Sequence, residues 1–258
     1  SGYAMSALTV VYALLMYIAT AILLIGVGRK IYIYARTPQP LKIPTTPAPT
    51  TRFGVVLRVA REVIVFESLF KSNKWIWLFG FLFHLALLLA FFRHLRYALS
   101  PDSLLWPIIN LEIVQTAGKY GAFAMVAGLG GLFVRRIVVD RVRYISGPSD
   151  YLMLILLFLI AASGMMMTFV QHTDIVALKA FLLGWMLFDW QPLPADPTLL
   201  VHLGLVMVLA VVFPVSKLLH APGVFFSPTR NQVDNPREKR WTAGWSAELK
   251  NIKAGSTE

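Results

Sequence analysis

Long apolar segments alternate with short polar ones along the 258 residues of this chain. Five of the apolar segments reach the roughly 20 residues that an α-helix needs to cross a bilayer. These segments are Ala4–Val27, Trp75–Leu99, Ile113–Val134, Tyr151–Val170 and Pro197–Leu219. The pattern predicts an all-α membrane protein, built as a bundle of five transmembrane helices.

The third segment carries the clearest packing signal. Its small residues recur four positions apart, a spacing that lets two membrane helices approach closely. The pairs are Ala117 and Gly121, Ala124 and Gly128, and Ala127 and Gly131. We expect this helix to pack closely within the bundle.

The connecting segments differ in kind. Thr37–Thr51 holds five prolines and is interpreted as a polyproline-like spacer. Phe53–Phe70 mixes apolar and charged positions and is predicted to be an amphipathic helix at the membrane surface, either a lipid-facing anchor or a docking face for a partner. Ile175–Trp190 is predicted to be a second interfacial helix, because Trp185 and Trp190 suit the headgroup zone.

The charge distribution predicts the orientation. The formal net charge is +11, and the lysines and arginines gather in residues 28–74, 135–143 and 217–253, which five crossings place on one side. Because cytoplasmic loops carry the excess of Lys and Arg, we expect the N-terminus outside and the C-terminus in the cytoplasm. The predicted domains are a membrane domain, residues 1–223, with the cytoplasmic amphipathic helix 53–70, and a cytoplasmic tail, residues 224–258.

Histidines are the candidate chemistry of the apolar segments. His84 and His94 belong to the second apolar segment. His202 belongs to the fifth, and His220 directly follows it. An ionisable side chain in the hydrocarbon region is rare and marks a functional site by default. The chain has no cysteine, which excludes covalent c-type haem attachment and a cysteine-ligated iron–sulfur cluster. The pattern therefore predicts two non-covalent haem b groups, with these four histidines as the metal ligands.

Antiparallel packing of the second and fifth helices would set the pairing. It brings His84 to His220 on the inner side and His94 to His202 on the outer side. The rise between His84 and His94 is about 15 Å, and that between His202 and His220 about 27 Å. Helix tilt, haem tilt or a kink at Pro214 must absorb the difference.

One alternative of a different class stays open. The chain could be a haem-free membrane scaffold or transporter subunit, with the histidines hydrogen-bonded inside the bundle. A metal transporter would normally add intramembrane carboxylates or sulfur ligands, which the apolar segments lack. The fifth histidine, His172, lies beside Asp174 at the outer end of the fourth segment and is expected to be solvated or interfacial.

The histidine pattern resembles that of a known family. Two histidines on the second helix and two on the fifth match the gamma-subunit family of respiratory nitrate reductase, which are five-helix cytochrome b proteins. The segments Phe92-Arg93-His94-Leu95-Arg96-Tyr97 and Phe226–Arg237 are similar to one branch, the DsrM-type cytochrome b subunits of the transmembrane electron-transfer complex of dissimilatory sulfur metabolism. The resemblance spans about Val55 to Arg240.

This resemblance implies a two-haem electron wire in a multi-pass protein of a prokaryotic inner (cytoplasmic) membrane. Electrons would pass between the quinone pool, with menaquinone or ubiquinone as the substrate, and a DsrK-like cytoplasmic iron–sulfur subunit. A multihaem cytochrome c subunit, a periplasmic iron–sulfur subunit and a second membrane subunit are the other implied partners. The chain would be an electron-transfer subunit of an oxidoreductase complex without catalytic residues of its own.

Three basic residues are further candidates for cofactor binding near the outer histidine pair. Arg93 and Arg96 flank His94 and either pair with haem propionates or snorkel to the interface. Lys119 lies at a similar depth in the third segment, where it either donates to a quinone carbonyl or snorkels. The resembling family, in which quinone is thought to bind near the outer haem, favours the quinone role.

Overall fold

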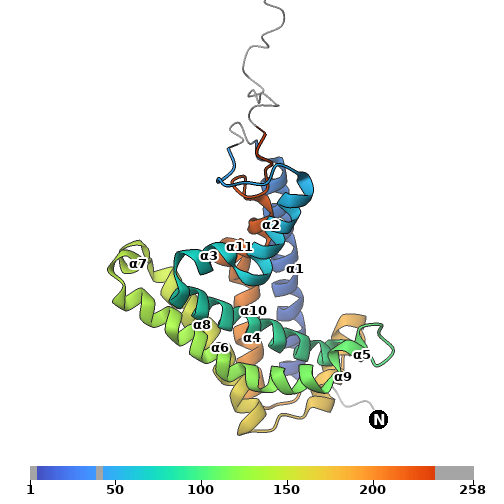
Figure 1. Ribbon diagram of the computed structural model, residues 1–258. Coiled ribbons are helices and arrows are strands. Elements are labelled where there is room, and N and C mark those ends of the chain that lie inside the picture. The colour runs from blue at the N-terminus through green and yellow to red at the C-terminus, as the bar shows by residue number, and fades with distance from the viewer. Residues whose placement is uncertain (1–4, 39–42, 236–258) are drawn as a thin grey trace, which may run out of the picture. The chain divides into compact units, whose positions relative to one another are not determined.

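The structure is a computed structural model that describes residues 5–38 and 43–235. Within these ranges every regular element is helical, which confirms the predicted all-α fold (Figure 1). The α-helices are α1 (Ala7–Arg36), α2 (Arg52–Val65), α3 (Glu67–Ser72), α4 (Lys74–Ala98), α5 (Trp106–Ile109), α6 (Glu112–Val138), α7 (Asp140–Ile145), α8 (Pro148–Phe169), α9 (Ile175–Leu187), α10 (Pro197–Val212) and α11 (His220–Gly223). Ala4, predicted to begin the first span, and the predicted tail beyond residue 235 lie outside the described residues.

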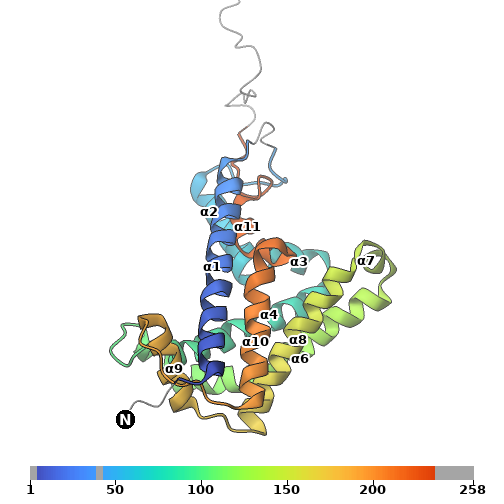
Figure 2. The same cartoon turned by 180° about the vertical axis from the view of Figure 1, so that it is seen from behind.

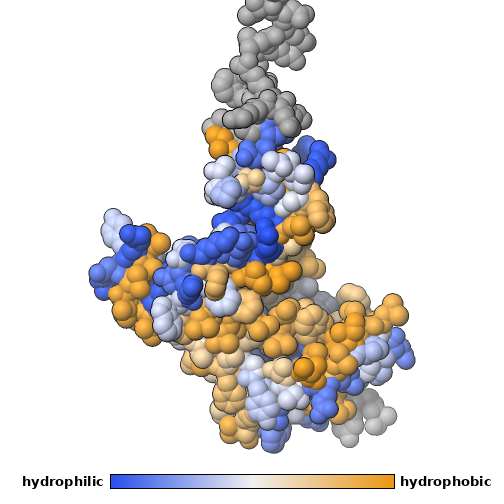
Figure 3. All heavy atoms as spheres, viewed as in Figure 1, coloured by the Kyte–Doolittle hydropathy of each residue, from blue (hydrophilic) through white to orange (hydrophobic). Residues whose placement is uncertain are grey.

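Five helical stretches are long and apolar enough to cross a membrane, as predicted. They are α1, α4, α6, α8 and Pro197–Val215, which joins α10 to the 3₁₀ turn Phe213–Val215. Large apolar side chains such as Leu88 and Phe91 on α4 and Val138 on α6 are exposed on these helices. The face drawn in Figure 3 is accordingly apolar along much of α4 and α6. Hydrocarbon, rather than water, is the solvent that such a surface fits.

The chain divides into two compact units. The first comprises residues 1–28 and 65–218, and the second comprises residues 29–64 and 219–258. The membrane-spanning helices other than the end of α1 belong to the first unit. The predicted division into a membrane domain, residues 1–223, and a tail, residues 224–258, stays a prediction. The two compact units are defined by packing within the chain and not by the boundary of a membrane.

In the first unit, small residues on α6 bring it against α4. A Cβ atom at Gly118 would lie 2.8 Å from the Cβ atom of Arg93, and one at Gly128 would lie 3.0 Å from the Cβ atom of Phe83. Only hydrogen fits at such a distance, so glycine sets the separation of the two helices. The predicted close packing of the third span is thus confirmed, and its partner is α4.

Packing continues from α6 to α8 and from α8 to α10, and these helices lie side by side in Figures 1 and 2. A buried cluster of Phe83, Ala86, Met125, Leu129 and Ala161 joins α4, α6 and α8. The histidine-bearing helices α4 and α10 are not among the closely packed pairs of the described residues. The helices α6 and α8, rather than direct packing of α4 on α10, therefore set the separation of α4 and α10.

The last span departs from the prediction of one helix from Pro197 to Leu219. The α-helix ends at Val212, and 3₁₀ turns at Phe213–Val215 and Lys217–Leu219 follow it. Pro214 lacks a backbone N–H and its ring clashes with the preceding turn, so the α-helix cannot continue through it. Gly26 on α1 accommodates the proline, since a Cβ atom there would be 2.6 Å from the Cβ atom of Pro214. The sequence predicted that helix tilt, haem tilt or a kink at Pro214 absorbs the difference between the His84–His94 and His202–His220 rises. Of these three, the structure has a break of the α-helix at Pro214.

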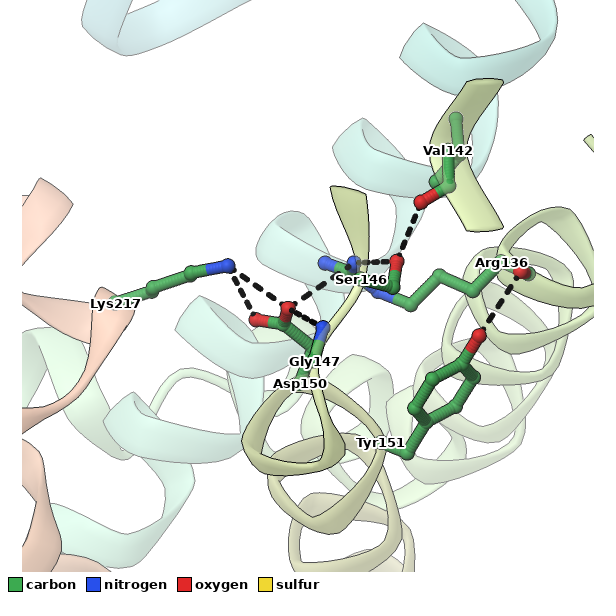
Figure 4. Close-up of polar contacts among 7 residues, drawn as sticks. All are labelled: Arg136, Val142, Ser146, Gly147, Asp150, Tyr151 and Lys217. Carbon is green, nitrogen blue, oxygen red and sulfur yellow. Dashed lines mark hydrogen bonds and ion pairs between the residues drawn. The ribbon is translucent and has the colours of Figure 1, made fainter. Parts of the chain in front are cut away.

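A buried carboxylate fastens the chain beyond this break (Figure 4). Asp150, 6% exposed, lies near the start of α8 and is 2.8 Å from the Nζ atom of Lys217 and 3.8 Å from a guanidinium nitrogen of Arg136 on α6. The backbone N–H of Gly147 also donates to Asp150. The cluster therefore joins α6, α8 and the segment after α10.

The predicted amphipathic helix Phe53–Phe70 is also interrupted. α2 ends at Val65 and α3 begins at Glu67, with Phe66 between them in the left-handed region at φ 53° and ψ 49°. A bulky residue rarely adopts this conformation, so tertiary contacts must hold Phe66 there. Exposed apolar residues do follow one face of α2: Phe53, Val56, Leu57 and Ile64.

The second unit folds the first part of the tail onto the proline-rich segment. The backbone N–H of Thr45 donates to the carbonyl of Thr229 (2.9 Å), and that of Asp234 donates to the carbonyl of Pro49 (2.8 Å). The Arg230 guanidinium is 2.5 Å from the Glu62 carboxylate on α2. Residues 224–235 are thereby fastened within this unit.

The predicted outer interfacial helix ends early, at Leu187 rather than Trp190, because Phe188 is left-handed. The Trp185 indole donates to the carbonyl of Ala13, and the Trp190 indole donates to the hydroxyl of Tyr17. Both tryptophans therefore attach α9 and the following loop to α1.

Candidate functional site

Two of the four predicted histidine ligands face each other in the first unit. His94 lies on α4 and His202 on α10, with ring centroids 6.3 Å apart and ring planes inclined by 18°. His202 is 8% exposed, whereas His94 as a whole residue is exposed. The predicted outer pairing is thus present as a spatial juxtaposition of two imidazoles from separate spans.

The separation of the two rings fits a pair of imidazoles that hold one metal ion. Two imidazoles bonded to opposite sides of a metal ion, by bonds of about 2 Å, place their ring centres roughly 6 Å apart. His94 is exposed, and α4 and α10 are not among the closely packed helix pairs of the described residues. The residues present therefore fit a haem iron held between His94 and His202.

Hydrogen bonds fix which nitrogen each ring presents. The Nδ1 atom of His94 is 2.6 Å from the carbonyl of Ala90, one turn earlier on α4. A carbonyl can only accept, so Nδ1 carries the proton. In the neutral ring the lone pair then lies on Nε2, which is the nitrogen available to bind a metal.

In His202, the hydrogen bond at Nδ1 comes from a side chain instead of a backbone carbonyl. Its Nδ1 atom is 2.8 Å from the hydroxyl of Ser163 on α8, and that hydroxyl donates its hydrogen to the carbonyl of Ile160 (3.0 Å). Since the single hydroxyl hydrogen is used, Nδ1 of His202 is the donor and Nε2 carries the lone pair. Ser163 was not recognisable from the sequence, because a serine inside an apolar span carries no signal of its neighbours.

The other two predicted ligands belong to different units. His84 on α4 has its Nδ1 atom 2.7 Å from the carbonyl of Gly80, the same arrangement as in His94. The rings of Phe66 and Phe83 lie edge-on against it, with centroids 4.9 Å and 5.0 Å away. His220 begins α11 in the second unit. The pairing of His84 with His220 stays a prediction from the sequence.

Arg93 and Arg96 converge on Gln115 at the beginning of α6. Arg93 donates to the backbone carbonyl of Gln115 (2.7 Å), and Arg96 donates to its side-chain oxygen (2.8 Å). The Gln115 amide in turn donates to the carbonyl of Ile109 (2.5 Å). Both arginines are therefore held beside His94, and each retains further N–H groups. A role in binding propionates stays a prediction.

Lys119 lies over two aromatic rings. Its Nζ atom is 5.5 Å from the ring centroid of Phe169 and 5.7 Å from that of Tyr120, within the range of cation–π attraction. An open groove of about 460 Å³ lies on the same part of α6, lined by Glu112, Ile113, Thr116, Ala117 and Tyr120. Lys119 does not line this groove but adjoins it through Tyr120. His172 is exposed after α8, as expected of a solvated residue.

No three His, Asp or Glu side chains within residues 5–38 and 43–235 are grouped so that they could hold a metal ion together. A haem needs only two protein ligands, because the porphyrin supplies the other four nitrogens. The histidine pair is therefore the arrangement in the described residues that fits a metal-containing group.

Comparison with known proteins decides the family. The nitrate reductase gamma subunit family matches residues 53–237, which include all four histidines of the two predicted pairs. The chain belongs to this family. It is 36% identical, over 270 aligned residues, to the Hdr-like menaquinol oxidoreductase cytochrome b-like subunit of Archaeoglobus fulgidus, with 89% of this chain and 81% of the relative covered. The protein of the same description in Archaeoglobus profundus is 33% identical over 285 residues, with 93% and 83% covered.

These matches confirm the resemblance to DsrM-like cytochrome b subunits that the histidine segments and the tail predicted. With the five apolar spans, they establish the chain as a multi-pass membrane protein, and the archaeal relatives fit a prokaryotic cytoplasmic membrane.

Proposed function

We propose that this chain is a di-haem cytochrome b subunit that carries electrons between menaquinol and a cytoplasmic iron–sulfur partner in a sulfur-metabolism respiratory complex. The observation that carries the proposal is the His94–His202 pair, with ring centroids 6.3 Å apart and both Nδ1 atoms engaged. The family membership and the menaquinol oxidoreductase relatives support it.

The chain's residues would hold the cofactor by their Nε2 atoms. His94 and His202 would bind one haem on the predicted outer side, and His84 and His220 a second on the inner side. Each bound haem would supply a one-electron carrier, whose potential would depend on the histidines that hold it and on their hydrogen bonds. The arginines that Gln115 orients would face the propionates of the outer group.

Quinol oxidation needs a route for protons as well as electrons. Menaquinol releases two electrons and two protons to become menaquinone, so its site must reach both an electron acceptor and water. We propose a site near the α6 groove on the predicted outer side, with the Lys119 ammonium as a donor to a quinone oxygen. The Glu112 carboxylate at the groove can accept a released proton.

The inner end would exchange electrons with the cytoplasmic partner, an iron–sulfur subunit of the DsrK type. Its dock would comprise Phe53–Phe70, the Arg135–Arg143 loop and the tail, because these segments carry most of the basic residues of the predicted cytoplasmic side. The multihaem cytochrome c, the periplasmic iron–sulfur subunit and the second membrane subunit stay implied by the resemblance.

A spectroscopic experiment tests the proposal. The purified chain should show the α-band of a low-spin b haem in its reduced-minus-oxidised spectrum, and a menaquinol analogue should produce the same band as dithionite. A chain without the band would instead be the haem-free scaffold or transporter subunit that the sequence leaves open. A band that dithionite but not quinol produces would contradict the quinol-linked part of the proposal.

A further inference from the structure

The orienting hydrogen bonds of the histidines differ in origin. His84 and His94 each donate from Nδ1 to a carbonyl four residues earlier on their own helix, Gly80 and Ala90. Such a bond comes with the helix and does not depend on any side chain. His202 instead uses the hydroxyl of Ser163, which comes from a different helix.

Ser163 is placed to accept a hydrogen bond from His202. Its hydroxyl donates to the Ile160 carbonyl at 3.0 Å, which turns an oxygen lone pair toward the Nδ1 atom of His202 at 2.8 Å. Gly164 brings the α8 backbone to the same edge of the ring, since a Cβ atom there would be 3.5 Å from the Cε1 atom of His202. The Nδ1 edge of His202 thus lies against α8, and its Nε2 edge is directed away from α8.

We infer that Ser163 is a positioning residue that sets the orientation and the donor strength of His202. The inference rests on the proposed function, because it concerns His202 as a ligand. An acceptor at Nδ1 increases the basicity of the imidazole and favours the higher charge state of a metal at Nε2. Removing that acceptor should destabilise the ferric form relative to the ferrous form. It should also free the ring to turn about its side-chain bonds.

Ser163→Ala tests this inference in the purified full-length chain with its haems. Redox titration should show the ferric–ferrous equilibrium of one b haem shifted at least about threefold toward ferrous, roughly 30 mV at 59 mV per tenfold change for one electron. The titration of the other haem should not move. Ser163→Thr keeps the hydroxyl and should restore the original equilibrium.

A matched control is available on the same helix. Thr168 donates to the Gly164 carbonyl one turn earlier (3.0 Å), as Ser163 does to its own helix, and within the described part of the chain its side chain is not hydrogen-bonded to a histidine. Thr168→Ala should leave both haems unchanged. Haem content by pyridine haemochrome and the low-spin ferric EPR signal of each variant are read alongside the potentials.

The outcomes separate the inference from the function on which it rests. A shift of one haem, or its loss, in Ser163→Ala alone supports the inference. Unchanged content and potentials in that variant, an equal shift in Thr168→Ala, or an equal shift in Ser163→Thr overturns it while the haem assignment stands. Absence of b haem from the unaltered chain overturns the proposed function and the inference together.

Discussion

The outer and inner histidine regions are built differently. His94 and His202 come from two long spans of one compact unit, and both have their Nδ1 atoms hydrogen-bonded. In the inner region, His84 lies on the same α4 helix, but His220 follows two 3₁₀ turns and belongs to the other unit. The predicted outer site would thus depend on helix packing, whereas the predicted inner site would depend on a segment that follows the end of α10.

This difference indicates how each ligand is held in place. On the outer side, the packing of α4 on α6, of α6 on α8 and of α8 on α10 connects the two histidines through continuous helices. On the inner side, Asp150 fixes Lys217 just after the break, three residues before His220. We expect the outer site to resist local changes better than the inner one.

The largest expected effect comes from removing a ligand on one side. His94→Ala should remove the outer haem and leave the inner one largely intact, and His84→Ala should do the reverse, because each haem would rely on its own two axial bonds. Haem content and reduced-minus-oxidised spectra measure this. His172→Ala is the control and should retain both haems. Loss of both haems from either single variant would show that the two regions are not independent sites.

Truncation separates the inner region from the partner it would serve. A chain ending after Gly223 loses the contacts of Thr229, Arg230 and Asp234 with the proline-rich segment and α2, and should release the iron–sulfur partner without loss of haem absorbance. A chain ending after Asn235 keeps those contacts and serves as the control. Co-purification of the two variants with the partner is the measurement. Full yield with the shorter chain would exclude the tail as a dock.

The spans and their histidines follow from the sequence because apolar length and residue identity are local properties. The small-residue spacing on α6 likewise predicted close packing, and Gly128 makes that contact with α4. The left-handed Phe66 could not be foreseen, since no residue signal distinguishes it from the helical residues on either side. Ser163 and Gln115 were missed for a related reason, because their importance lies in partners 39 and 19 residues away in the chain.

A smaller effect is expected from Lys119, which belongs to the outer region. Lys119→Ala should slow haem reduction by a quinol analogue at least about tenfold, roughly 1.4 kcal/mol, without altering the haem spectrum. Lys179→Ala is a matched control, since Lys179 is a lysine of the predicted outer side that lies over Trp106 on α5. Stopped-flow reduction of both variants gives the comparison. Equal rates in the two would move the quinone site away from Lys119.

The smallest effect tests the packing that holds the outer region together. Gly118→Ala places a methyl group against Arg93 and the Leu89 carbonyl, and should lower the free energy of unfolding by about 1–3 kcal/mol through overpacking. A Cβ atom at Gly130 on the same helix would meet no neighbouring group of the described residues within 4 Å, so Gly130→Ala should be neutral or slightly stabilising. Denaturation of both variants in one detergent compares them. Equal stability would refute the close α4–α6 contact at Gly118.

The most direct measurement is the number of b haems in the purified, unaltered chain, by pyridine haemochrome against protein concentration. The account predicts about two per chain, low-spin and bis-histidine ligated. Fewer than about one haem per chain would contradict the proposal that the His94–His202 and His84–His220 pairs are haem sites.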